Sequence, residues 1–326
     1  MSFPFSAYLA ATLSSLLVTF VSLPFWRRWC VRTGLVDDPG HRKIHESSVP
    51  LAGGLAVITG LLIPLLVGAL FLKSNGLMEA KASYLLRYGL NRRALELVAI
   101  LAGAVGMLVL GLLDDKHELR PGLKFIGQIL VASLVAVSGV RITLFVPNIL
   151  FSYAITILWV LTVINAFNFM DNMNGLCAGL GMIGAWYFAI IATANDQYLV
   201  ALIAFLTFGS LLGFIPWNFP RARAFLGDSG SHLIGYLLAV LAILPHFYTV
   251  RHPQRWAVFA PLLVLGVPLL DLVTVVLLRW RIGQPFYVAD NNHLSHRLVR
   301  AGLTRTRAVL FIWLAAAVLG ASACFF

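Results

Sequence analysis

The feature that most constrains this chain is a series of apolar runs, each about as long as a bilayer is thick. A helix needs roughly 20 apolar residues to cross the hydrocarbon core, and only helices or closed barrels satisfy their backbone groups there. The connections between the runs are too short for a soluble domain, so the sequence predicts one all-α polytopic membrane domain, residues 1–326, with about ten transmembrane helices. The candidate spans are 7–26, 51–72, 94–113, 123–140, 149–168, 175–194, 198–216, 231–248, 256–278 and 307–326.

Composition agrees with a membrane protein. Only 11% of the residues are charged, whereas soluble domains carry about 25%. The net charge of +11 comes from basic residues scattered between apolar runs, so we expect no nucleic-acid partner. Cys30, Cys177 and Cys324 lie far apart and predict no disulfide framework or metal site. The N-terminus lacks the basic segment of a cleaved signal peptide, so we expect the first run to remain as an anchor.

Charged residues favour one side of the predicted bundle. Of the 24 basic residues, 16 fall in the odd-numbered connections, which the positive-inside rule places in the cytoplasm, with both termini outside. Nine of the 13 acidic residues follow the same parity. Acidic residues contribute little to topology, so their placement predicts an active site on the cytoplasmic face, built from the odd-numbered loops.

The stretch from Gly213 to Gly235 holds the most concentrated polar motif. Asn218, Phe225 and Asp228 lie in it, and Asp228 opens the helix that follows. A helix start offers free N–H groups to anions, and an aspartate beside it is a natural metal ligand. The structural alternative is a turn in which Asp228 only caps the helix.

Two adjacent carboxylates, Asp114 and Asp115, end an apolar span, where charge is costly. They repel each other and favour a nearby cation. Neighbours on a helix point in different directions, so one can face a metal while the other faces a substrate or a lysine. Lys124 and Gln128 share one face of the next helix. A polar helix terminus without a ligand is the alternative.

A stripe of polar residues marks the third odd-numbered connection. Asn165, Asn168, Asp171 and Asn174 recur every three residues, which brings them close together at a helix end. Such a stripe suits a nucleobase, a ribose or a metal, and it equally suits hydrogen bonds between helices.

Basic residues form a second stripe in the last connection. His293, His296, Arg297 and Arg300 fall on one face of a short helix that Asp290 or a following asparagine would cap. The stripe fits a pyrophosphate or a lipid phosphate, or simply anionic membrane lipids.

Two further features are open to both functional and structural interpretations. Lys43 and His45, in the first odd-numbered connection, suit phosphate but also suit an ordinary solvated loop. Asp271 lies inside a span, eight residues before Arg279. Carboxylates within a span are functional candidates, although pairing with the arginine would be structural.

The motifs occur in a recognisable order. The segments are GLVDDPGHRKIHESSVPLAGG, LGLLDDKHELRPGLKFIGQ, NAFNFMDNMNG, WNFP to FLGDSGS, RWRIGQPF and HLSHRL. With them, the chain resembles the polyprenyl-phosphate N-acetylhexosamine-1-phosphate transferases. It is more similar to the bacterial branch that starts O-antigen, teichoic acid and enterobacterial common antigen synthesis than to the phospho-MurNAc-pentapeptide translocases.

The resemblance implies a reaction in the bacterial cytoplasmic membrane. N-acetylhexosamine 1-phosphate, with GlcNAc as the first choice of sugar, passes from a UDP-sugar to undecaprenyl phosphate with release of UMP. The implied cofactor is Mg²⁺, with Mn²⁺ as a substitute. Membrane lipids are further expected partners, and a homodimer is an open option. Asp228 corresponds to the metal ligand, and Asp114, Asp115 and His293 complete the implied catalytic set. The substrate-binding candidates are Lys43, His45, Lys124, Asn168, Asp171, Asn174, Asn218, Phe225, Arg279, Arg281, His296 and Arg297.

Two departures from the family pattern concern the substrate. Asn174 stands where the third motif usually has a second acid, and Ser295 stands where the last motif usually has a histidine. They put the identity of the sugar in doubt. The alternatives are a phospho-MurNAc-pentapeptide transferase, a transporter of phosphorylated metabolites and a lipid-binding scaffold. Transporters place ionisable residues near the bilayer midplane, whereas here they gather at its edge.

Overall fold

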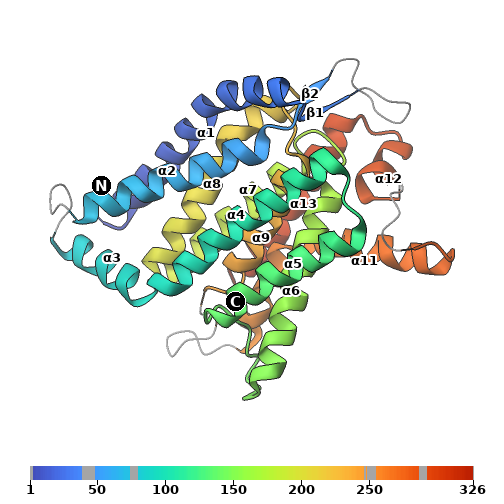
Figure 1. The fold of residues 1–326 in the computed structure, drawn as a ribbon. Helices are drawn as coiled ribbons and strands as arrows, with labels where there is room; N and C mark the ends of the chain where they lie inside the picture. Colours follow the sequence, from blue (N-terminus) through green and yellow to red (C-terminus); the bar gives the residue numbers. More distant parts are fainter. Residues whose placement is uncertain are drawn as a thin grey trace.

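The structure is a bundle of α-helices with one short antiparallel strand pair (Figure 1). It is a computed structural model that describes residues 3–38, 48–73, 80–245, 247, 255–285 and 292–325. The elements are α1 (Phe5–Thr33), β1 (Val36–Asp37), β2 (Val49–Pro50), α2 (Gly53–Lys73), α3 (Ala80–Arg92), α4 (Ala94–His117), α5 (Pro121–Val137), α6 (Ile149–Met170), α7 (Leu176–Ala194), α8 (Tyr198–Asn218), α9 (Gly227–Leu241), η1 (Arg255–Phe259), α10 (Ala260–Val264), α11 (Gly266–Arg281), α12 (Leu294–Arg300) and α13 (Arg305–Ala323).

The all-α polytopic membrane architecture is confirmed, and each predicted span coincides with helical structure. Seven helices in the described part of the chain are long and apolar enough to cross a membrane: α1, α2, α4, α6, α7, α8 and α13. A bent segment made of η1, α10 and α11 would be an eighth. The predicted count of ten is not reached on this measure, because α5 has only 17 residues and α9 only 15.

The short helix α9 is the centre of the bundle. At 1.5 Å per residue it is about 22 Å long, less than the roughly 30 Å of a hydrocarbon core. Residues 229–241 are all buried, and α4, α6, α2 and α7 pack around them. A helix that is apolar on every side is stable when protein surrounds it. Because α9 contacts protein rather than lipid, it need not match the bilayer thickness.

Glycines bring α9 against its neighbours. A Cβ on Gly111 of α4 would lie 2.3 Å from the Cα of Ser229, and a Cβ on Gly54 of α2 would lie 2.7 Å from the backbone nitrogen of Gly230. Any side chain at these two positions would push the helices apart. This close approach holds the last turn of α4, which carries both adjacent aspartates, beside the start of α9.

The ninth predicted span is not one straight helix. Its parts, Trp256–Val264 and Gly266–Arg281, meet at 74°, with the break at Leu265. The amphipathic helix α3 was not predicted at all, because it is too polar to be read as a span.

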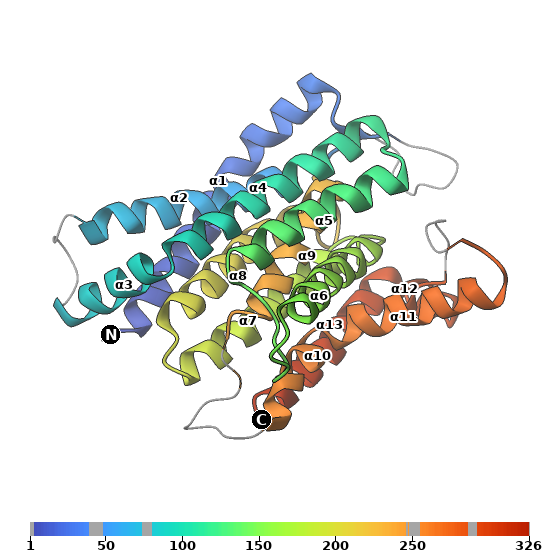
Figure 2. The ribbon, with the colours of Figure 1, turned by 60° about the horizontal axis from the view of Figure 1, so that its bottom comes forward.

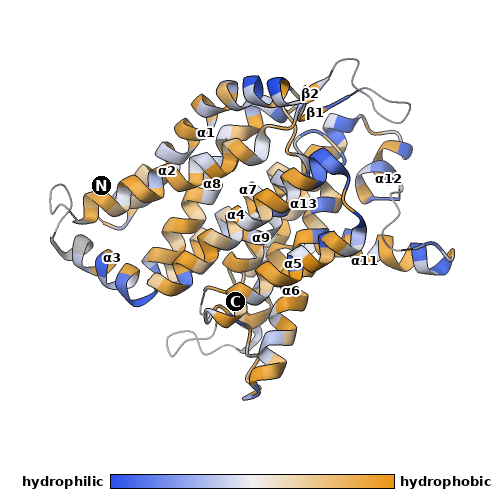
Figure 3. Ribbon diagram, viewed as in Figure 1, coloured by the Kyte–Doolittle hydropathy of each residue, from blue (hydrophilic) through white to orange (hydrophobic). Residues whose placement is uncertain are grey.

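Apolar residues dominate the long helices of the bundle (Figure 3). Leu9, Leu13, Leu17 and Phe20 of α1 are all exposed, among many others. So much exposed apolar surface suits a lipid environment. Figure 1 places both termini away from the β1–β2 pair, and Figure 2 shows the same bundle turned by 60°. The side of the membrane on which the termini lie stays a prediction.

Candidate active site at the start of α9

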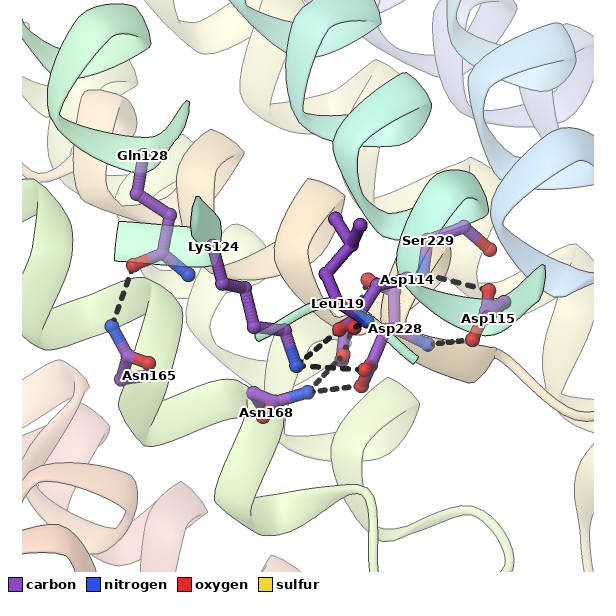
Figure 4. Close-up of polar contacts among 10 residues, drawn as sticks. Asp114, Asp115, Leu119, Lys124, Gln128, Asn165, Asn168, Asp228 and Ser229 are labelled. Carbon is purple, nitrogen blue, oxygen red and sulfur yellow. Dashed lines mark hydrogen bonds and ion pairs between the residues drawn. The ribbon is translucent and has the colours of Figure 1, made fainter. Parts of the chain in front are cut away.

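Four helices bring charged and amide side chains together at the N-terminal end of α9 (Figure 4). Lys124 Nζ of α5 lies 2.8 Å from Asp228 Oδ2 of α9 and also contacts Asp114 Oδ2 of α4. Asn168 of α6 donates from Nδ2 to Asp228 Oδ1 at 2.5 Å. We call Asp114, Lys124, Asn168 and Asp228 the aspartate–lysine cluster. Two carboxylates in this cluster share one ammonium group.

The turn between α4 and α5 is folded back onto Asp114. Glu118 takes a left-handed conformation with φ of 47°, and its N–H donates to the carbonyl of Asp114. The N–H of Leu119 donates to Asp114 Oδ1 at 2.9 Å. Pro121 then starts α5, a position where proline costs nothing because the first N–H groups of a helix have no partner within it. The tight turn places Lys124, one turn into α5, against the aspartates.

The neighbouring carboxylate, Asp115, points in a different direction from Asp114, as predicted. Its Oδ1 accepts from the N–H of Asp228 at 2.7 Å and its Oδ2 from the N–H of Ser229 at 3.1 Å. Gly227, with φ of 67°, makes room, since a Cβ there would lie 2.7 Å from Asp115 Oδ2. The expectation of free amides for a bound anion is therefore wrong for these two, because Asp115 is already the anion at the start of α9.

The three asparagines of the predicted stripe hydrogen-bond to different parts of the structure. Asn165 donates to Gln128 Oε1 at 2.9 Å, and Asn168 joins the aspartate–lysine cluster. Because α6 ends at Met170, Asn174 lies beyond the helix and donates to the carbonyl of Pro220. The three-residue spacing therefore does not bring all of these side chains to one place.

Asp171, just beyond α6, reports the excess of negative charge nearby. Burial, together with the carboxylates of Asp228, Asp115 and Asp37, raises the pKa of its carboxyl to about 8. A cation at the start of α9 would relieve this repulsion.

A second polar group lies where α11 meets α12. Asp271 Oδ2 is 2.7 Å from His293 Nδ1, and both side chains are buried. The Phe169 ring lies edge-on to the His293 ring at 5.4 Å between centroids, and the guanidinium of buried Arg279 stands 4.9 Å from the centre of the Phe169 ring. We call Phe169, Asp271, Arg279 and His293 the histidine cluster. Phe169 follows Asn168 in sequence, so the end of α6 touches both clusters.

The Asp271 carboxylate also caps the start of α12. Its Oδ1 accepts from the N–H of Leu294, the first residue of that helix, at 2.6 Å. The residue expected to cap this helix, Asp290, lies outside the described residues. The described partner of Asp271 is His293, whereas the structural alternative from the sequence was pairing with Arg279. His293 follows the loop after α11, and a fixed sequence spacing cannot anticipate a contact across that loop.

The other basic candidates of the last connection are less buried. His296 is half-buried, and its pKa is lowered by burial and by the nearby His293 and Arg300. Arg281 and Arg297 are exposed, so the structure does not gather the whole predicted stripe into one pocket.

Polar groups of the loop before α9 form hydrogen bonds with backbone groups of neighbouring segments. Asn218 Oδ1 accepts from the N–H of Gly175 at 2.6 Å, and its Nδ2 donates to the carbonyl of Ala224 at 2.9 Å. The N–H of Phe225 donates to the carbonyl of Pro50. These bonds tie the starts of α7, α2 and α9 together, while nucleotide contacts at Asn218 and Phe225 stay predictions.

Of the remaining candidates, Lys43 and His45 lie outside the described residues. Ser295, one of the two departures, is buried and donates to Asn172 Oδ1 at 2.7 Å. The smaller side chain thus links α12 to the loop after α6.

The sequence analysis missed His232. Its ring is fully buried, and neither ring nitrogen has a hydrogen-bond partner among the described residues. The ligand atoms of Asp114, Asp228 and His232 all lie within 4.8 Å of one another. A histidine four residues after Asp228 in an apolar run was the available signal, since the two share a helix face. Carboxylate oxygens and an imidazole nitrogen so disposed fit a divalent metal ion.

A large cavity elsewhere contains none of these residues. It has a volume of about 710 Å³ and lies at the opposite end of the helices, between the start of α4, the loop after α5 and the end of α9. Its lining is mostly apolar and includes the charged residues Arg93, Glu96 and Arg141.

Fold and site together define an integral membrane protein with carboxylates and a lysine gathered where its helices meet the polar loops. Comparison of the sequence with known proteins gives the family. Residues 97–246 match the family described as glycosyl transferase family 4. The chain is 30% identical to a probable undecaprenyl-phosphate N-acetylglucosaminyl 1-phosphate transferase of Bacillus subtilis, over 96% of this chain and 83% of the relative.

Two other relatives carry similar names. A decaprenyl-phosphate N-acetylglucosaminephosphotransferase of Mycobacterium tuberculosis is 33% identical over 96% of this chain and 81% of its own length. An undecaprenyl-phosphate alpha-N-acetylglucosaminyl 1-phosphate transferase of Escherichia coli K12 is 29% identical over 94% and 80%. The chain belongs to the polyprenyl-phosphate N-acetylhexosamine-1-phosphate transferase family, as its motifs indicated.

Proposed function

We propose that this protein transfers GlcNAc 1-phosphate from UDP-GlcNAc to undecaprenyl phosphate, releasing UMP and forming a lipid-pyrophosphate-linked sugar. The names of the relatives support the sugar and the polyprenyl acceptor. The observation that carries the proposal is the aspartate–lysine cluster, where Asp114 and Asp228 share Lys124. A site for two phosphate-bearing substrates needs cations, and this cluster supplies one and can hold another.

The proposed cofactor is Mg²⁺, with Mn²⁺ as a substitute, and the residues at the start of α9 fit such an ion. Asp228 and Asp114 would hold it, with His232 within reach of the same point. When bound, the ion would neutralise charge on the donor diphosphate.

The chain itself supplies the other functions. The Lys124 ammonium can bind a phosphate oxygen, and Asn168 orients the Asp228 carboxylate through its hydrogen bond. Asp115 holds the start of α9 in place. In the histidine cluster Asp271 accepts from His293 Nδ1, so the Nε2 of that ring can face a phosphate or the sugar.

The proposed reaction is a single displacement. An oxygen of the lipid phosphate attacks the phosphorus that bears the sugar, and the bond from that phosphorus to the UMP oxygen breaks, with the electron pair leaving on UMP. The second pKa of a phosphate monoester is about 6, so the lipid phosphate is mostly dianionic at neutral pH and needs little help from a base.

A direct assay tests the proposed function. Purified full-length protein is incubated with undecaprenyl phosphate, Mg²⁺ and, in parallel, UDP-GlcNAc, UDP-GalNAc, UDP-glucose or UDP-MurNAc-pentapeptide. We expect UMP and a lipid-linked sugar from UDP-GlcNAc first. Release of UMP only with the pentapeptide donor would favour the translocase alternative, and no UMP with any donor would overturn the proposal.

The proposed site faces the cytoplasm. Single cysteines at the exposed positions His117 and Tyr84, in a background with exposed Cys324 changed to serine, test this side assignment. We expect an impermeant thiol reagent added to intact cells to label position 84 and not position 117. The reverse pattern would overturn the side assignment and leave the chemistry untouched.

A further inference from the structure

His232 is a fully buried polar side chain. Its ring is 0% exposed, and neither Nδ1 nor Nε2 is hydrogen-bonded to any described residue. Buried polar groups in folded proteins are nearly always satisfied, and one that is not indicates an ion or a water molecule. A histidine kept only for packing would be replaceable by an apolar residue at lower cost.

The ring lies where a cation is favoured. His232 follows Asp228 by one helical turn, so both side chains leave the same face of α9. Asp114 approaches from α4, and the three ligand atoms lie within 4.8 Å of one another. The close contact of Gly111 with Ser229 fixes α4 against α9, so the donors come from two rigid elements rather than from a mobile loop.

His232 is not hydrogen-bonded to either carboxylate of the cluster in the described structure. Lys124 already provides the ammonium group that Asp114 and Asp228 share. A neutral imidazole adds no positive charge to that pair, but it offers a nitrogen lone pair to a metal ion. The chemistry that this geometry suits is therefore ligation.

We propose that His232 is a nitrogen ligand of the divalent-metal site, and that it shifts metal preference from Mg²⁺ toward Mn²⁺ and other first-row ions. Mg²⁺ favours oxygen ligands, whereas imidazole favours transition metals. The inference rests on the proposed function only in placing a metal at Asp228. It adds a specificity-determining residue whose effect can be measured without turnover.

The test is Mn²⁺ binding to the purified full-length protein, without nucleotide or lipid, followed by electron paramagnetic resonance on ¹⁵N-histidine-labelled material. We expect one bound Mn²⁺ with hyperfine coupling from a directly ligated histidine nitrogen. His232→Phe, which fills the space without a donor, should lose the coupling and weaken Mn²⁺ binding at least about ten-fold, while Mg²⁺ affinity changes less. His232→Gln keeps a polar donor and should retain binding with a smaller Mn²⁺ to Mg²⁺ preference.

His117→Gln is the matched control, because His117 is exposed at the end of α4, three residues after Asp114, and does not belong to the three candidate metal ligands. It should leave the coupling unchanged. Absence of histidine coupling in the wild-type protein, or its persistence in both His232 variants, would overturn the proposal. An active enzyme without coupling would reject His232 as a ligand but keep the proposed function, whereas coupling in a protein that turns over no UDP-sugar would do the opposite.

Discussion

The aspartate–lysine cluster and the histidine cluster use their carboxylates in opposite ways. In the histidine cluster, both oxygens of Asp271 accept hydrogen bonds from neighbouring groups, the ring of His293 and the N–H of Leu294. In the aspartate–lysine cluster, Asp114 and Asp228 compete for one ammonium. A self-satisfied carboxylate fixes the position of other groups, whereas carboxylates in excess of their cations are suited to binding one more. The comparison predicts that one cluster acts through position and the other through charge.

The largest expected effect comes from Asp228→Asn. The amide keeps the shape but removes the charge, so UMP release should fall by at least about 10²–10³-fold, and the response to added Mg²⁺ should weaken. The amide oxygen can accept from Asn168 but not also from Lys124. Thermal unfolding in detergent should still change little, because Lys124 keeps Asp114 as its ion-pair partner and the repulsion between the two carboxylates is removed. Exposed Glu118→Gln, on the same turn as the cluster, is the control and should remain active. Wild-type activity and metal response in Asp228→Asn would remove the charge side of the comparison.

Asp271→Asn should give a smaller loss of a different kind. One amide oxygen cannot accept from both His293 and Leu294, and a lost hydrogen bond to a charged group costs about 1.5–3 kcal/mol. We expect a lower unfolding temperature and reduced turnover with an unchanged Mg²⁺ dependence, measured as activity against Mg²⁺ concentration. If the metal response shifted as it does in Asp228→Asn, the two clusters would not be separable.

Much of this comparison could be predicted from residue type and spacing, and part of it could not. A polar motif opening a helix after a span indicated Asp228, and the i, i+4 spacing indicated that Lys124 and Gln128 share a face. The sequence does not contain the tertiary approach of α4 to α9, so it could not show that Asp115 occupies the amides of Asp228 and Ser229.

Long-range returns of the chain were also hidden. Asp271 has its partners 22 and 23 residues away across a loop, and no periodicity connects them. Most helix ends were predictable within a few residues, but α1 ends at Thr33 rather than at 26 and α9 at Leu241 rather than at 248. The break at Leu265 was not predictable, because its flanking runs are apolar on both sides. The burial of α9, which makes a 15-residue helix sufficient, depends on the packing of four other helices.

A third prediction concerns Asp171, whose pKa is raised by burial and by nearby carboxylates that include Asp228 of the aspartate–lysine cluster. Its folded-state pKa of about 8 lies above the ordinary value of 3.8. The folded protein therefore holds a proton that the unfolded chain has lost, and this contribution to stability is fully present below pH 4 and disappears as the pH rises through 8. Between pH 6 and 9 the unfolding temperature of the wild-type protein should fall more steeply than that of Asp171→Asn. Equal slopes would mean that neither burial nor the neighbouring carboxylates raise the pKa of Asp171.

The last prediction expects no signal at all. A covalent route would have Asp114 or Asp115 attack the donor and carry the sugar phosphate. Neither carboxylate is placed for this in the described residues: Asp115 accepts two backbone N–H groups, and Asp114 is held by Leu119 and Lys124. Direct displacement instead needs both substrates bound together.

Enzyme mixed with UDP-GlcNAc and Mg²⁺, but without lipid acceptor, should therefore release no stoichiometric burst of UMP on a rapid time scale. Asp115→Asn should behave identically in this assay, since that carboxylate only holds the start of α9. A burst that leaves labelled sugar phosphate on the wild-type protein, and that vanishes in Asp114→Asn or Asp115→Asn, would establish a covalent carrier. Asp114 or Asp115 would then have to leave its present partners during turnover, and it would act as a nucleophile rather than as a ligand or an anchor.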